Sequence, residues 1–234
     1  MQHFDFFISK NFEKQILLDM FKNDKTKTIK NRARQYKFPV KLAKNIARIS
    51  GNECEEKLEH FLNVSYERDA KRMTNCLNIF KYYWDKNSNY YFCKLENFFE
   101  KNIEQYEVLL SRYVAGTSDW YGNHICTNIF SLKWKKYCNH NYCLLYEVVL
   151  SEVFKAIRKL RTVDKLSDNN VWILSELSSF VILHRLFDEF DFIKKTYYEQ
   201  VDVLLDKAYL IFDNSNGIND FIKRMIGVDF INQC

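Results

Sequence analysis

Five residues that could bind a metal ion fall within one stretch of the chain. A His-x-Cys pair is followed by Cys-x-His-x-x-Cys, which places together His124, Cys126, Cys138, His140 and Cys143. Thiolates and imidazoles are the ligands that Zn²⁺ prefers, and four of them would have to converge in a tetrahedron. On a helix, however, positions 124 and 126 point about 200° apart, and the sequence has no Cys-x-x-Cys pair. We therefore expect no metal or other cofactor, and interpret the cysteines as reduced thiols packed as small apolar residues.

Patterns that would specify a reaction are missing from the sequence. No Gly-x-Gly occurs and the Gly-x-x-x-x-Gly-Lys loop is absent, which excludes nucleotide hydrolysis by a P-loop. A cysteine nucleophile would need a histidine beside it in space, and nothing in the sequence selects such a pair. We therefore identify no catalytic residue and expect a protein that is not an enzyme.

Two groups of carboxylates could bind cations, do acid–base chemistry or occupy a basic active site on a partner protein. They are Glu53, Glu55, Glu56 and Glu59, and Asp188, Glu189 and Asp191. Aromatic residues cluster around position 86 in numbers that one buried helix face cannot hold, so some are expected to anchor a partner. The aromatic candidates are Tyr82, Tyr83, Tyr90 and Tyr91.

The elements that would position these residues are predicted to be helices. The chain of 234 residues contains only five glycines and one proline, and its apolar residues recur with a period of 3.6. The pattern predicts helices near 10–22, 26–36, 40–50, 53–63, 66–86, 89–114, 118–138, 142–161, 168–187, 189–213 and 218–226. Ser65, Ser118 and Ser167 are expected to cap helices, and residues 85–89 to form a polar turn.

These helices predict an all-α fold, either an irregular bundle or a short solenoid of antiparallel helical hairpins. A basic helical segment, 1–64, is expected to pack on a bundle of long helices, 65–234, within one structural domain. No apolar run reaches the roughly 20 residues of a membrane span, and the first ten residues do not resemble a signal peptide. We expect a cytoplasmic protein.

Positive charge is concentrated in residues 22–48. Ten basic residues and one acid give this segment a net charge of +9, whereas the whole chain carries +5 and the remainder therefore about −4. The segment could bind nucleic acid, an acidic protein or the acidic remainder of its own chain, or be a solvated face. Its two short amphipathic helices suggest a helix-turn-helix, although that motif needs a third packed helix and Pro39 fits its turn poorly. The candidate residues are Lys25, Lys27, Lys30, Arg32, Arg34, Lys37, Lys41 and Lys44.

Three segments resemble all-helical immunity proteins of bacterial polymorphic-toxin and contact-dependent inhibition systems. They are Ser-Tyr-Glu-Arg-Asp at 65–69, Leu-Leu-Ser-Arg-Tyr-Val-Ala-Gly at 109–116 and Trp-Ile-Leu-Ser-Glu-Leu-Ser at 172–178. In that family the first segment begins a long helix, the second ends a helix and the third lies in a later helix. The resemblance implies a non-enzymatic protein that neutralises a cognate toxin, such as a nuclease, by covering its active site. The alternative is a nucleic-acid-binding or regulatory protein that uses residues 22–48.

Overall fold

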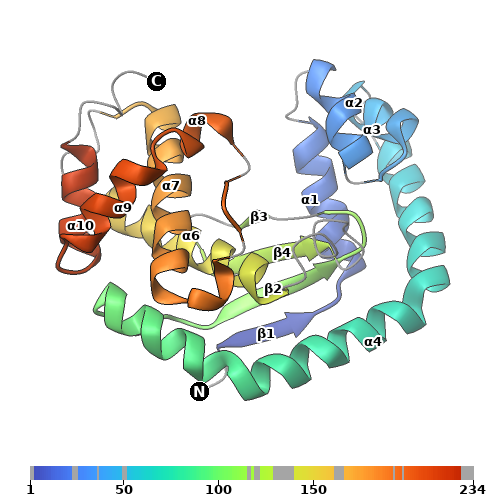
Figure 1. The fold of residues 1–234 in the computed structure, drawn as a ribbon. Helices are drawn as coiled ribbons and strands as arrows, with labels where there is room; N and C mark the ends of the chain where they lie inside the picture. The colour runs from blue at the N-terminus through green and yellow to red at the C-terminus, as the bar shows by residue number, and fades with distance from the viewer. Residues whose placement is uncertain are drawn as a thin grey trace.

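The structure is a computed structural model that describes residues 3–22, 26–35, 37–48, 52–114, 117–118, 122–128, 140–160, 166–191, 193–196 and 198–227. Most of these residues are helical, which confirms the predicted helical class. Figure 1 shows the helices arranged around a small sheet. Among the described residues, none of the helices combines the length and apolar character needed to cross a membrane.

The first and last parts of the chain follow the predicted helices closely. The helices that agree with the prediction are α1 (Lys10–Lys22), α2 (Thr26–Gln35), α3 (Val40–Arg48), α6 (His140–Lys159), α7 (Asp168–Leu186) and α10 (Gly217–Ile226). Ser167 caps α7 as predicted, because its hydroxyl accepts a hydrogen bond from the Asn170 amide at 3.2 Å. The helix predicted over 189–213 is wrong as a single element. It is divided into the 3₁₀ turn η2 (Asp188–Phe190), α8 (Glu199–Asp202) and α9 (Leu205–Asp213).

A single 48-residue helix, α4 (Asn52–Phe99), replaces the helices predicted over 53–63 and 66–86 and the first part of the one predicted over 89–114. No glycine or proline interrupts this stretch. The Ser65 hydroxyl is buried and bonds to the Tyr113 hydroxyl at 2.8 Å, so it does not cap a helix. The predicted turn at 85–89 is helical as well. In Figure 1, α4 curves from α3 beneath the sheet to α10, and the boundary predicted between residues 64 and 65 falls inside it.

The central sheet was not predicted. Its strand order is β1-β2-β4-β3, formed by β1 (Phe4–Phe7), β2 (Tyr106–Ser111), β3 (Thr117–Ser118) and β4 (His124–Asn128). Strands β1, β2 and β4 are parallel, whereas β3 is antiparallel to β4. The helices predicted over 89–114 and 118–138, including the cap at Ser118, are therefore wrong in these parts. Parallel strands buried on both faces have continuous apolar sequences, which resemble buried helix.

Both faces of the sheet are buried, each in its own core. Val108 and Leu110 of β2 join a core formed mainly with α4, α6, α7 and α10. The residue between them, Leu109, joins a second core formed with α1, α2, α3 and the start of α4. Successive side chains of a strand point to opposite faces, so β2 contributes to both cores, as β4 does through Ile125 and Cys126.

The continuity of α4 generates a prediction. Asn89 is exposed, and proline at this position would remove a helical hydrogen bond and clash with the preceding turn. We expect Asn89→Pro to lower the free energy of unfolding by about 3 kcal/mol or more, and Asn89→Ala to change it by less than about 0.5 kcal/mol, as measured by urea denaturation. If residues 85–89 formed a turn, the two variants would have similar stability.

Candidate nucleic-acid interface

Helices α2 and α3 are joined by a short, well-defined turn. The Phe38 amide donates to the Ala33 carbonyl at 2.8 Å, and the Lys37 amide donates to the Arg34 carbonyl at 3.1 Å. Lys37 has a φ of 54°, so the turn has the left-handed residue and paired bonds that end many helices. Pro39 follows, and its carbonyl accepts from the Ala43 amide at 3.0 Å to begin α3. Proline is compatible with this position because it lies before the helix interior.

The third helix that the sequence left in doubt is α1. It packs against α3, and Figure 1 shows α2 and α3 together beside α1. Phe38 is 3% exposed. Its ring lies 5.3 Å from Phe21 of α1 and 5.4 Å from Phe61 of α4, measured between centroids. The three helices and their turn therefore supply the elements of a helix-turn-helix, two short helices joined by a tight turn and packed on a third, and Phe38 also packs them against α4.

The outer surface of this unit is basic. On α3, Ala43 and Ile46 are buried while Lys41, Lys44 and Arg48 are exposed at helical spacing. With the exposed basic residues of α2 and the turn they form a surface that we call the basic face: Lys30, Arg34, Lys37, Lys41, Lys44 and Arg48. None of these six forms an ion pair with another described residue. Their charge is available to a partner.

The remaining basic candidates are not assigned to the basic face. Lys25 is outside the described residues, the side chain of Lys27 is likewise not described, and Arg32 is only half-exposed. Two nearby lysines neutralise acids of α4: Lys14 contacts Glu59 at 2.9 Å and Lys22 contacts Glu55 at 3.1 Å. Of these two lysines only Lys22 belongs to the segment 22–48, and its contact with Glu55 directs one charge of that segment at the chain's own acids.

The predicted acidic partner site at the start of α4 is largely compensated within the chain. Besides the pairs of Glu55 and Glu59, Glu53 contacts Lys57 at 2.5 Å. The hydrogen bond from Lys57 lowers the pKa of Glu53, and that from Lys14 lowers the pKa of Glu59. Glu56 is exposed.

The other predicted partner residues lie in the second half of α4 and around η2. Tyr82 and Tyr90 are 64% and 50% exposed, Tyr91 is buried at 5%, and Tyr83 is half-buried. Tyr91 packs on Phe187 with centroids 5.3 Å apart, which brings it to η2. The three acids at this turn, Asp188, Glu189 and Asp191, are exposed. The structure therefore gathers the aromatic residues near 90 with the acids near 190, but the group at 53–59 lies at the other end of α4.

The metal-like residues do not form a site among the described residues. No group of three His, Cys, Asp or Glu side chains there could hold a metal ion. His124 begins β4 and contacts Glu107 at 2.9 Å, and Cys126 is buried in the second core. Cys143 lies on α6, whereas Cys138 and the side chain of His140 are outside the described part. Burial raises the pKa values of the Cys54 and Cys76 thiols, which disfavours the nucleophilic thiolate.

One feature of this region was missed by the sequence analysis: the buried carboxylate of Glu13. It accepts hydrogen bonds from the Ser111 hydroxyl at 2.5 Å and from the amides of Arg112 at 3.0 Å and Tyr113 at 2.6 Å. The Val114 amide, at 3.3 Å, and the Tyr66 hydroxyl complete the set. Burial, with Glu13 beside it, raises the pKa of Tyr66, which keeps this phenol a donor. The sequence did contain a signal for the burial of Glu13. At helical spacing it lies on the same face of α1 as Leu17 and Phe21, which are buried.

A second contact joins α4 to the end of β2, next to the residues that bind Glu13. Arg112 Nε donates to Asp69 Oδ2 at 2.6 Å, which links the end of β2 to α4. Burial alone would raise the pKa of Asp69, but Arg68 and Arg112 outweigh it and hold that pKa below its usual value. Glu13 thus fastens α1 to the end of β2, and Asp69 fastens α4 to the same place.

Two of the three segments that suggested immunity proteins have different local structures from those the resemblance implies. Residues 65–69 lie inside α4 and do not begin a helix, and Leu109–Ser111 end strand β2. Residues 172–178 lie in α7, as expected. Comparison with family models, curated proteins and solved structures found no match for the chain.

The Glu13 contacts predict a large loss of stability on truncation. Glu13→Ala would leave the Arg112 amide and the hydroxyls of Ser111 and Tyr66 without their acceptor, at about 1–3 kcal/mol for each buried donor. We expect the free energy of unfolding in urea to fall by at least about 3 kcal/mol. The control is Glu59→Ala, which removes a half-exposed ion pair and should cost less than about 1 kcal/mol. Equal losses in the two variants would contradict this role.

Proposed function

We propose that the protein binds double-stranded DNA through the basic face. The observation that carries the proposal is the set of six exposed basic side chains, unpaired among the described residues, on a helix-turn-helix unit. Three of them, Lys41, Lys44 and Arg48, lie along one face of α3. Lysine and arginine bind phosphates, and release of counterions from DNA drives such binding.

The shape of the unit favours duplex DNA over duplex RNA. An α-helix with its side chains is about 10–12 Å across, and the major groove of B-DNA is about 12 Å wide. The major groove of A-form RNA is deep and too narrow for side chains to read. Helix α3 would enter the major groove, while Lys30 and Arg34 of α2 would contact the phosphate backbone beside it.

The proposal predicts a loss of DNA binding when the charge of α3 is reversed. We expect the triple variant Lys41→Glu, Lys44→Glu, Arg48→Glu to bind a fluorescent DNA duplex at least about 100-fold more weakly than the native chain in low salt, by fluorescence anisotropy. The matched control is Lys71→Glu, Lys195→Glu, Lys223→Glu, which changes net charge equally at exposed lysines elsewhere. This control should lose much less affinity. Equal losses, or no binding by the native chain, would refute the proposal.

Salt dependence gives an independent check. If the six basic side chains neutralise phosphates, the logarithm of the binding constant should fall with the logarithm of salt concentration with a slope of roughly −5. Lys44→Ala should reduce the magnitude of this slope by about 1. A slope near zero would mean that the basic face does not contact phosphates.

A second candidate function is binding of a protein partner, such as the toxin that the resemblance implies. It is supported by Ile79, Tyr82 and Tyr90, which are exposed by 64%, 64% and 50% along one face of α4. Exposed tyrosines are common anchors of protein interfaces. This function predicts a one-to-one protein complex that survives nuclease and high salt and is lost in Tyr82→Ala, Tyr90→Ala, while DNA binding is unchanged.

A further inference from the structure

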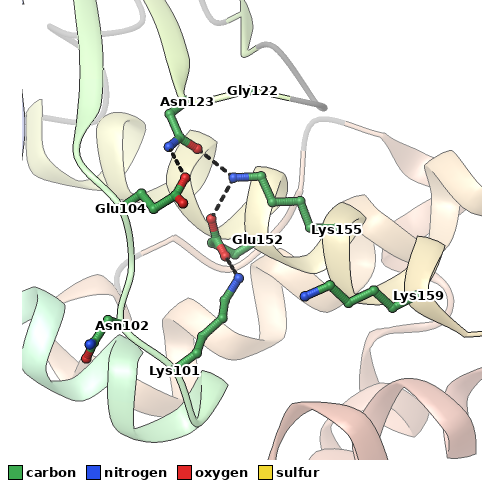
Figure 2. A pocket seen from close by; sticks show the side chains of 8 residues that line it. All are labelled: Lys101, Asn102, Glu104, Gly122, Asn123, Glu152, Lys155 and Lys159. Carbon is green, nitrogen blue, oxygen red and sulfur yellow. Dashed lines mark hydrogen bonds and ion pairs between the residues drawn. The ribbon is translucent and has the colours of Figure 1, made fainter.

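A polar pocket lies at the amino ends of the parallel strands, where β2 and β4 begin. Its volume is about 380 Å³, within the usual range for small-molecule sites. Figure 2 shows the side chains around it. Among the described residues the lining has no apolar side chain: Lys101, Asn102, Glu104, Gly122, Asn123, Glu152, Lys155 and Lys159. Such a lining fits a charged, hydrophilic ligand.

The floor of the pocket is the carboxylate of Glu152, which is 2% exposed. Glu152 Oε1 accepts from the Tyr106 hydroxyl at 2.8 Å and from Lys155 Nζ at 3.0 Å. Its other oxygen forms an ion pair with Lys101. Burial alone would raise the pKa of Glu152, but Lys101, Tyr106 and Lys155 outweigh it and lower that pKa. One negative charge is therefore matched by two positive charges.

Ammonium donors remain after these contacts are made. A lysine ammonium has three N–H donors. Lys101 uses one on Glu152, and Lys155 uses two, on Glu152 and on Asn123 Oδ1 at 2.6 Å. Lys159 makes no hydrogen bond or ion pair with any described residue, and Figure 2 shows its ammonium directed toward the pocket.

The carboxylate of Glu104, also in the lining, contacts an amide group. Glu104 Oε2 accepts from Asn123 Nδ2 at 2.7 Å, and Asn123 thereby connects Glu104 to Lys155. The described part of the lining, with three lysines and two glutamates, has a net charge of +1. The three ammonium groups come from the segment after α4 and from α6, and they face the pocket from two sides (Figure 2).

We propose that this pocket binds a phosphate group, either as the free ion or as part of a small phosphorylated molecule. Lysines act as point charges toward phosphate, and a tetrahedral anion can accept hydrogen bonds from several directions. Lys159 and the unused donors of Lys101 and Lys155 would hold its oxygens. The second Nδ2 hydrogen of Asn123 would contact the attached part of a phosphorylated ligand. This site is separate from the basic face and does not depend on DNA binding.

The test is isothermal titration calorimetry of the full chain with inorganic phosphate, pyrophosphate and adenosine monophosphate. We expect saturable binding, weakened roughly tenfold by Lys159→Ala, which removes one charge-assisted contact. Glu104→Gln should strengthen binding severalfold, because it removes a negative charge from the lining. Lys71→Ala, another exposed lysine on a helix, is the matched control and should bind as the native chain does.

The pattern among ligands and variants decides the outcome. Tighter binding of the monophosphate than of inorganic phosphate would identify a phosphorylated molecule as the source, and the reverse would identify the free ion. In either case, Lys159→Ala must weaken binding of the ligand for the proposal to hold. Absence of saturable binding of all three ligands would overturn the proposal. It would also be overturned if Lys159→Ala bound normally and the variant with Lys41, Lys44 and Arg48 reversed did not, since phosphate would then occupy the basic face.

Discussion

The buried carboxylate of Glu13 is the interaction on which the rest of the structure depends. A buried carboxylate is stable only where several donors converge on it, and the turn after β2 supplies three amides and a hydroxyl. Successive backbone amides of this kind form an anion-binding concavity. Here the anion belongs to the chain itself, so α1 is fixed to the sheet at one position. Tyr66 adds a donor from α4 to the same carboxylate.

The placement of α1 determines what the molecule presents at its two ends. Helices α1, α2 and α3 share the second core with Leu109 and Cys126 of the sheet. When α1 is held in place, α2 and α3 are therefore held with their basic face toward solvent. The carboxyl ends of parallel strands are the usual ligand-binding edge of open α/β sheets. At β2 this edge is occupied by Glu13. The polar pocket lies at the opposite edge, where Lys101, Lys155 and Lys159 stand beside the amino ends of β2 and β4.

The sequence predicted those parts of the fold that are governed by local signals. Helices α1, α2 and α3 have separate amphipathic patterns, and α7 has a capping serine. The sheet could not be found in this way, because Val108, Leu109 and Leu110 are buried on both faces and lack the alternation of a half-exposed strand. Polar residues at 85–89 suggested a turn, but an exposed helix surface is polar too.

The candidate site was predicted in part for the same reason. Exposed lysines on α3 follow from its amphipathic pattern, whereas the partners of Lys14 and Lys22 lie on α4 and depend on tertiary packing. Glu152 and its lysines could not be assigned to a pocket, because Lys101 is 51 positions away in sequence. The end of α4 and α6 come together through tertiary packing, by way of β2 and α10.

The most direct test of this account is native-state hydrogen exchange of Glu13→Gln compared with the native chain. If Glu13 fastens the helix-turn-helix unit to the sheet, amides of α1, α2, α3 and the end of β2 should lose protection together, while those of α6 and α7 keep theirs. Loss of protection confined to residues 111–114, or equal loss throughout the chain, would contradict the central role of this carboxylate.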